Sequence, residues 1–143
     1  WVRRVPVIFF VLTALVVVLG VITTGAGPHS GDSEVGYRFD WIDPARAARI
    51  HAMAVWAFIA ALVVTLLATR GPVSATTPQD RARRAWWVLL AVTLAQGLIG
   101  YVQYFTGLPI GLVALHLFGS AALIAAVTFA VLALRTRPSA SAI

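Results

Sequence analysis

Cysteine and lysine are both absent from this 143-residue chain, and only 5 of its residues are acidic. Without cysteine the chain can form neither a disulfide nor a zinc–thiolate site, and it has no thiol nucleophile. Charged residues amount to 11%, whereas soluble domains carry about 25%, so a water-soluble globule is not expected. A disordered chain is excluded as well, because disordered chains are poor in apolar residues and hydrophobic residues make up 60% of this one. The composition predicts a membrane protein.

All the basic side chains other than histidine are arginine, and the formal net charge is +6 with a pI near 11.4. The arginines lie in short clusters between long apolar runs. This pattern is typical of membrane orientation rather than of a nucleic-acid-binding face. We therefore expect membrane lipid around the chain and no nucleic-acid partner.

Uncharged stretches cover 5–31, 50–69 and 85–134. A membrane-spanning helix needs roughly 20 mainly apolar residues, and Thr-Gly-Leu-Pro at 106–109 interrupts the longest stretch with a turn signal. In lipid only helices or closed barrels satisfy the backbone, and these runs lack the alternation of a barrel strand. The sequence therefore predicts an all-α membrane protein, a single four-helix transmembrane bundle over 1–143 built from two helix pairs, with spans near 6–25, 45–69, 83–105 and 110–134.

The first span shares one feature with a signal peptide, because Arg3 and Arg4 precede its apolar core. That core continues to Ile22, which is longer than the roughly 7–15 residues of a signal-peptide core and favours a spanning helix. The chain begins with Trp1 rather than Met. We expect it to be a piece of a longer polypeptide or a sequence that lacks its true start.

Arginine placement predicts the orientation of the bundle. With four spans, both chain ends and the 70–84 loop share one side, which carries eight arginines against a single acid, Asp80. The opposite side carries Arg38, Arg46 and Arg49 together with the other four acids. Because positive charge is retained on the cytoplasmic side, we expect a multi-pass protein of the cell membrane with both termini in the cytoplasm.

The second and fourth spans are related by an internal repeat. His51 aligns with His116, 65 residues later, and six further identities follow: Ala57, Ile59, Ala60, Ala61, Leu67 and Ala68 match Ala122, Ile124, Ala125, Ala126, Leu132 and Ala133. Alanine and leucine are common in any spanning helix, so the matched histidines are the more informative identity. The two spans are predicted to be equivalent elements of two helix pairs.

An ionisable side chain inside a membrane is costly and rare, so each one is a functional candidate. Two such side chains fall inside the predicted spans, His51 and His116. If their helices begin at Ala45 and Ile110, each histidine lies six residues in, about 9 Å below the helix start. Equal depth on two helices that enter from the same side is what a ligand shared between them requires.

Imidazole is a standard axial ligand of haem iron, and a haem between two helices needs one such donor from each helix at matched height. It also needs small residues that let the helix backbones approach the macrocycle. Such residues lie beside both histidines: Gly119, Ser120, Ala48, Ala52 and Ala54. Arg46 and Arg49, at the mouth of the second span, are candidates for pairing with haem propionates. The pattern favours a haem iron held by His51 and His116.

Each of these residues also has a simpler explanation. An intramembrane histidine can hydrogen-bond to a neighbouring helix without binding a ligand, and it is the matched pair that favours haem over this alternative. Arg46 and Arg49 fit ordinary interfacial anchors better than propionate ligands. Zinc is disfavoured, because two histidines without a nearby Cys, Asp or Glu make an incomplete site.

Several other polar and aromatic residues leave more than one role open. The third span carries a stripe at spacings of three and four, which either packs helices or forms a wall of a cofactor pocket: Thr93, Gln96, Gly97, Gly100, Gln103 and Tyr104. Trp41, Trp56, Trp86 and Trp87 are expected in the interfacial belts, and Trp56 is also a candidate pocket wall. His29, in a segment rich in glycine and proline after the first span, is expected to be structural.

Four segments carry a resemblance to a known family: Thr-Gly-Ala-Gly-Pro-His-Ser-Gly-Asp (24–32), Arg-Ile-His (49–51), Gln-Gly-Leu-Ile-Gly-Tyr-Val-Gln-Tyr (96–104) and Leu-Pro-Ile-Gly-Leu-Val-Ala-Leu-His (108–116). Together they resemble the haem A synthase family, most closely the C-terminal half of its actinobacterial-type members. The resemblance covers essentially the whole chain, and the segments occur in the family's order and spacing. No segment is specific alone, but the four together are.

The resemblance implies an oxidoreductase of eight helices, made of two similar four-helix bundles, that oxidises a methyl group of haem O to the formyl group of haem A. It implies that the C-terminal bundle holds an electron-transferring haem b through two histidines, which correspond to His51 and His116. The substrate haem and the catalytic glutamate belong to the N-terminal bundle, and no Glu lies in a predicted span here. We therefore expect the chain to work with a missing N-terminal four-helix half or with a second copy of itself. The cysteine pair that many members carry in an outer loop is absent.

Two other classes of function stay open on the residues alone. One is a membrane b-type cytochrome that relays electrons without a haem substrate. Such a relay usually needs a second haem near the inner face, and no histidine lies in the inner half of a span. The other is a non-catalytic membrane scaffold whose histidines only form hydrogen bonds, in which case the protein would bind no chromophore.

Overall fold

The computed structural model describes residues 4–30, 38–69 and 78–134, and these residues form helices and no strand. The four helices are α1 (Arg4–Ala26), α2 (Pro44–Ala68), α3 (Pro78–Phe105) and α4 (Ile110–Ala133). Each of them is long and apolar enough to cross a membrane. The predicted all-α fold with four spanning helices is therefore confirmed, and the chain has the architecture of a multi-pass membrane protein.

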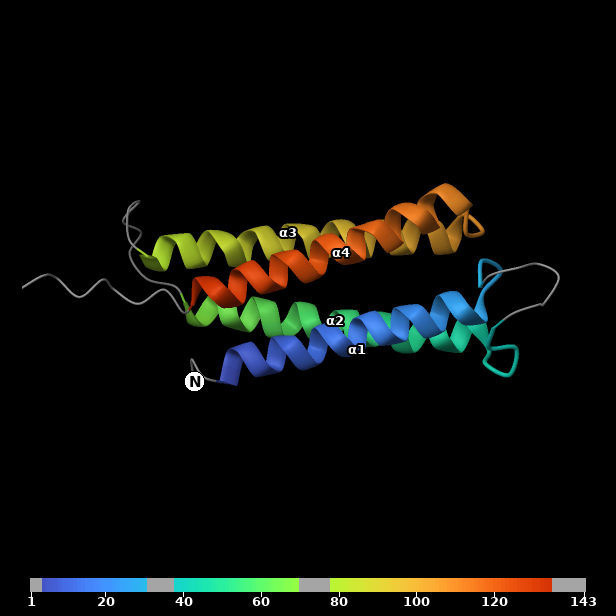
Figure 1. The fold of residues 1–143 in the computed structure, drawn as a ribbon, viewed down its shortest axis with the longest axis horizontal. Coiled ribbons are helices and arrows are strands. Elements are labelled where there is room, and N and C mark those ends of the chain that lie inside the picture. Colours follow the sequence, from blue (N-terminus) through green and yellow to red (C-terminus); the bar gives the residue numbers. More distant parts are fainter. Residues whose placement is uncertain (1–3, 31–37, 70–77, 135–143) are drawn as a thin grey trace, which may run out of the picture.

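The helices form two antiparallel pairs that lie side by side (Figure 1). α1 packs mainly on α2 and α3 mainly on α4, with smaller contacts between α2 and α3 and between α1 and α4. Within the described residues, no Cα atom of α2 comes within 8 Å of one in α4. These two helices are therefore diagonally opposite across the bundle, as are α1 and α3. The division into two helix pairs, predicted from the repeat, is confirmed.

The two ends of the bundle differ in what they join. At one end α1 and α3 begin and α2 and α4 end, and we call the half of the bundle next to it the terminal half. At the other end lies the 106–109 turn between α3 and α4, and we call that half the turn half. The ribbons of the two helix pairs diverge toward the turn half (Figure 1).

Local sequence explains where the helices begin. Asp43 caps α2, because its carboxylate accepts hydrogen bonds from the backbone N–H groups of Ala45 (3.2 Å) and Arg46 (3.1 Å). α3 begins at Pro78, five residues before the predicted position of 83. Proline suits a first turn, where its missing N–H is not needed. The negative charge of Asp80 in the same turn stabilises the helix, because the N-terminal end of a helix carries partial positive charge.

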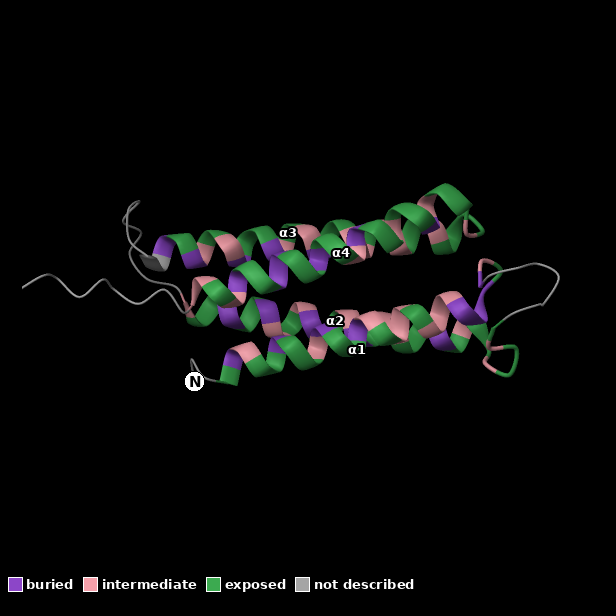
Figure 2. Cartoon of the chain, in the orientation of Figure 1, coloured by how far each residue is buried: buried purple, intermediate pink, exposed green. Residues whose placement is uncertain are grey.

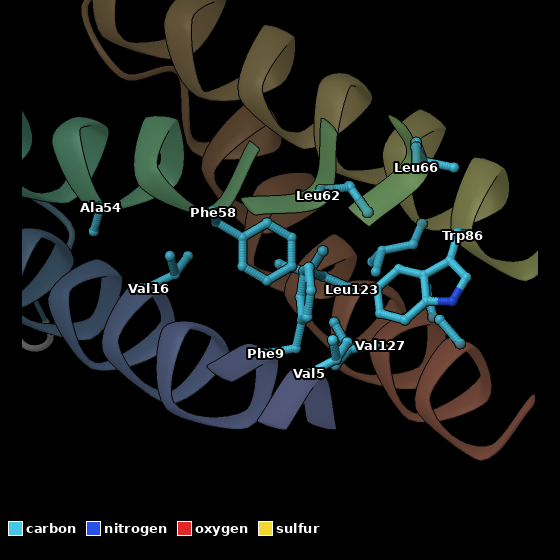
Figure 3. Close-up of a cluster of buried hydrophobic side chains, with 13 residues drawn as sticks. Val5, Phe9, Val16, Ala54, Phe58, Leu62, Leu66, Trp86, Leu123 and Val127 are labelled. Carbon is cyan, nitrogen blue, oxygen red and sulfur yellow. The ribbon is translucent and has the colours of Figure 1, made fainter. Parts of the chain in front are cut away.

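An apolar core fills the terminal half and draws on all four helices (Figure 3). Its centre is an edge-to-face aromatic group in which the Phe9 ring lies 5.4 Å from that of Phe58 and 4.7 Å from that of Trp86, centroid to centroid. Leu62 and Leu89 are also completely enclosed. The expectation that Trp86 lies in an interfacial belt was wrong, because its indole is 1% exposed and packs on α1. The neighbouring Trp87 is on the outer face of α3 and is exposed.

Large apolar side chains lie on the outside of the bundle, and exposed residues occur along every helix (Figure 2). They include Phe10, Phe105, Phe118 and Phe129. A water-soluble protein rarely exposes so continuous an apolar surface, whereas lipid favours it. The outer surface therefore agrees with the membrane-spanning character of the helices.

Candidate functional site

His51 lies on α2 in the turn half and faces α1 at a glycine. A Cβ atom built on Gly20 would lie 3.2 Å from Cε1 of His51, a separation that few real side chains reach. The glycine thus lets the imidazole lie directly against the backbone of α1. The ring also makes a polar contact with the backbone of Val16, which lies on α1 one turn before Gly20.

His116 on α4 repeats this arrangement against α3. A Cβ atom built on Gly100 would lie 3.3 Å from Cε1 of His116, and the ring makes a polar contact with the backbone of Gln96. In both pairs, the backbone contact is four residues before the glycine, so each ring occupies the same position on the first helix of its pair. The symmetry of the site therefore includes α1 and α3 as well as α2 and α4.

α1 and α3 also match each other in sequence, and the alignment of the histidines does not reveal this match. Thr13 and Gly20 align with Thr93 and Gly100 at an offset of 80 residues. Both threonines are buried and donate to the backbone carbonyl four residues earlier, at 2.6 Å for Thr13 and 2.7 Å for Thr93. The offset differs from the 65 residues that separate the histidines because the connection within the first pair is longer than that within the second, so a single alignment cannot find both.

The two imidazoles belong to diagonally opposite helices, and they are near enough to each other to interact electrostatically. His51 lies seven residues after the start of α2 and His116 six after the start of α4, so their depths match. Both side chains are half-buried. The structure thus places the two predicted site residues together in the interior of the turn half.

Each histidine has a buried ring nitrogen without a hydrogen bond. Within the described part of the chain, no donor or acceptor pairs with Nδ1 of His51 or with Nδ1 of His116. A buried polar atom without a partner destabilises the fold, and such an atom in a native structure calls for an explanation. Two of them, one on α2 and one on α4, make up a pair of nitrogen donors without protein partners among the described residues.

Three of the five small residues that were expected beside the histidines make other contacts. Gly119 packs against α3, and a Cβ atom there would overlap the side-chain amide of Gln96. Ala54 belongs to the apolar core, and the Ser120 hydroxyl donates to the carbonyl of Leu117 at 2.6 Å. The close backbone approach at the rings comes instead from Gly20 and Gly100, on α1 and α3.

The residues of the polar stripe on α3 do not all face the same surroundings. Thr93 and Gln96 pack within the bundle, whereas a Cβ atom built on Gly97 would meet no other atom within 4 Å. Gln103, one turn beyond Gly100, has a buried Oε1 atom for which the described residues offer no hydrogen-bond partner. Tyr104 is exposed and lies edge-on to Phe105, with ring centroids 5.4 Å apart.

Arg46 and Arg49 have exposed side chains near the start of α2. The sequence favours interfacial anchors over propionate ligands for both residues, and an exposed position at a helix start is compatible with either role. Trp56 is 58% exposed, and its indole N–H donates to the hydroxyl of Tyr101 on α3 at 3.2 Å.

His29 joins the two helix pairs, because its Nε2 atom lies 2.7 Å from the carbonyl oxygen of Leu108 in the turn between α3 and α4.

The donor set limits which ligand fits. In the described residues, no group of three or more His, Cys, Asp or Glu side chains is placed to hold a metal ion. A zinc site takes three or four protein ligands, whereas a haem brings its own four equatorial nitrogens and takes only axial ligands from the protein. In number and type, two imidazoles match the axial ligands of a haem, whereas they are too few for a zinc site.

Comparison of the chain with protein-family models, with curated proteins and with solved structures gave no match.

Proposed function

We propose that the chain is the haem b-binding half of a haem A synthase-like oxidoreductase, with His51 and His116 as the axial ligands. The observation that carries the proposal is the pair of buried, unpartnered imidazole nitrogens on diagonally opposite helices. Each ring makes one polar contact with the backbone of the neighbouring helix, at Val16 or at Gln96, and its Nδ1 atom has no partner among the described residues. The specific synthase reaction rests on the resemblance of the four sequence segments.

The residues of this chain would hold and orient the cofactor. His51 and His116 supply the two nitrogen donors, and Gly20 and Gly100 let each ring lie against the neighbouring backbone. The backbone contacts at Val16 and Gln96 orient the rings, as carbonyl partners commonly do for metal-binding histidines. A bound haem b would supply reversible one-electron transfer. The oxidation of haem O to haem A would take place in a partner four-helix half or in a second copy of the chain.

A reduced-minus-oxidised absorption spectrum of the detergent-purified chain tests the ligands. We expect the spectrum of a low-spin b-type haem, which is lost or converted to high spin in His51→Ala and in His116→Ala. His29→Gln is the matched control, because it replaces the one remaining histidine, and it should keep the low-spin spectrum. A folded chain without haem, or a low-spin spectrum that survives both alanine substitutions, would overturn the assignment.

The alternative is a b-type cytochrome that relays electrons without a haem substrate. One observation counts against it: none of the three histidines of the chain lies in the terminal half, so a second bis-histidine haem has no ligands there. Extraction of haems from cells that express the chain with its partner half separates the two functions. A synthase yields haem A, and His51→Ala in the same cells accumulates haem O, whereas a relay leaves the haem composition unchanged.

We also propose that the terminal half faces the cytoplasm and that the site lies toward the opposite face of the cell membrane. The support is the excess of arginine at the terminal ends of the spans. Because the chain contains no cysteine, single substitutions are unique labelling sites. A membrane-impermeant maleimide should label Thr106→Cys in intact cells, and Thr69→Cys only after the cells are opened. The reverse pattern would invert the proposed topology.

A further inference from the structure

The turn half is held together differently from the terminal half. In the terminal half the two helix pairs meet through the apolar core around Phe9, Phe58 and Trp86. In the turn half the described residues contribute two side-chain hydrogen bonds between the pairs, His29 to Leu108 and Trp56 to Tyr101. We call these two bonds the polar ties. The first tie lies at the end of the bundle, and the second joins α2 and α3 beside Gly100, against which His116 packs.

The first tie joins distant parts of the chain at the end of the bundle. His29 follows α1, and Leu108 precedes α4 in a turn where Gly107 has φ 78° and Leu108 has φ 59°. A non-glycine residue in the left-handed region needs support from its surroundings. The bond from His29 to the Leu108 carbonyl is a local contact that can supply it. The tie therefore fixes both the end of the bundle and the turn from which α4 starts.

The second tie crosses from α2 to α3 in an exposed position. Trp56 is the central residue of α2, twelve residues from each end, and its ring is 58% exposed. Tryptophan is usually found at the membrane interfaces rather than at the middle of a span. An indole N–H at that depth needs a polar partner, because lipid offers none, and the Tyr101 hydroxyl is that partner. Tyr101 follows directly after Gly100, against which His116 packs.

We infer that His29 and Trp56 are positioning residues, whose polar ties hold the two helix pairs together around the histidines and set how fast a bound haem leaves. This inference rests on the proposed function. Packed apolar cores resist separation because many contacts must break together, whereas two hydrogen bonds can break and re-form singly. The terminal core would act as the fixed end and the turn half as the end that opens.

Transfer of haem from the purified holoprotein to an excess of apomyoglobin measures the rate of haem loss. His29→Leu and Trp56→Phe, which each remove one donor, should accelerate transfer about three- to tenfold, the effect of losing one ordinary hydrogen bond. His29→Gln keeps an N–H donor and should restore the original rate. Thr128→Val is the matched control, because it removes a hydrogen bond within α4 (2.8 Å, to the carbonyl of Ile124) that does not join the pairs.

The Trp56 tie has an internal test of its own. Tyr101→Phe removes the acceptor and should accelerate haem transfer as much as Trp56→Phe does. The double variant should then be no faster than either single variant, because both remove the same bond. Additive effects in the double variant would show that the bond does not control haem loss.

Spin-label distances in the haem-free protein test the ties independently of haem. Met53 and Phe118 are exposed repeat equivalents in the turn half, and Leu67 and Leu132 are exposed repeat equivalents in the terminal half. In His29→Leu, the distance between labels at 53 and 118 should lengthen and broaden, while the distance between labels at 67 and 132 stays unchanged. Equal behaviour of the two distances, or an equal response to Thr128→Val, would overturn the inference. If the distances respond as expected but no haem binds, the ties hold and the proposed function fails.

Discussion

The terminal half and the turn half of this bundle have the same helices but different means of holding them together. The terminal half contains large interlocking side chains, with Phe9, Phe58 and Trp86 in edge-to-face contact. The turn half contains glycines against imidazoles, two polar ties and, among the described residues, three buried side-chain atoms without a hydrogen-bond partner: Nδ1 of His51, Nδ1 of His116 and Oε1 of Gln103. The terminal core contains one such atom, Nε1 of Trp86. The terminal half is thus held together mainly by packing, whereas most of the buried polar atoms without partners lie in the turn half.

This difference bears on the stability of the two halves. Side chains that pack closely stabilise a helix bundle in lipid through van der Waals contact, because burial from lipid supplies little hydrophobic driving force. Buried polar atoms without partners lower stability, and each one in a native structure calls for an explanation. A compact core at one end allows the other end to carry that cost.

The largest effect is expected from breaking the terminal core. Phe58→Ala should lower the free energy of unfolding by about 3 kcal/mol, because the cavity it leaves faces Phe9 in a site that cannot readily collapse. Unfolding in mixed detergent micelles, followed by circular dichroism, measures the change. Phe129→Ala is the matched control on the lipid-facing surface, where the ring is 69% exposed, and it should leave stability nearly unchanged. Equal losses in the two variants would show that the core does not determine stability.

A second substitution, in the turn half, is expected to change stability and haem affinity in opposite directions. Gly100→Ala improves helix propensity by up to about 1 kcal/mol, but it places a Cβ atom 3.3 Å from the His116 ring. We expect a stable protein whose affinity for haem falls about tenfold as the ring shifts. Gly97→Ala, three residues away with open space around it, should gain the same stability and keep its haem affinity. Haem titration followed by absorbance measures both, and equal affinities in the two variants would contradict the role given to Gly100.

The smallest effect is expected at the start of α2. Asp43→Ala removes the acceptor for two backbone N–H groups and should cost about 1 kcal/mol of stability. Because α2 carries His51 near this end, haem affinity should fall slightly as the first turn loosens. Asp43→Asn keeps an acceptor oxygen and should recover most of the loss in a denaturation experiment. A loss as large in Asp43→Asn as in Asp43→Ala would point to the charge rather than to the cap.

Much of the architecture follows from local sequence. Apolar runs of spanning length predict the helices, and Gly107 followed by Pro109 predicts the turn between the last two. The matched His51 and His116 predict the division into two pairs. The equivalence of Gly20 with Gly100 was missed, because the connections within the two pairs differ in length. The offset of 80 residues appears only when α1 is aligned with α3 separately from the alignment of α2 with α4.

The contacts between distant segments could not be predicted from one sequence. Trp86 and Trp87 are adjacent and chemically identical, yet one is enclosed by the core and the other faces outward. The bond from His29 to Leu108 joins residues 79 positions apart, and no local pattern connects them. Gly119 likewise gave no sign that it would receive the side chain of Gln96 rather than a ligand.

That this protein is a bundle of four membrane-spanning helices follows from its sequence alone, because hydropathy, helix length and turn residues act locally and lipid permits few alternatives. Which faces of those helices meet is settled by tertiary packing, and with it the enclosure of Trp86, the packing of each imidazole against a glycine and the two polar ties. Packing is needed for this choice because every face of an apolar helix is compatible with lipid. Only the fit of side chains between neighbouring helices selects the face that turns inward.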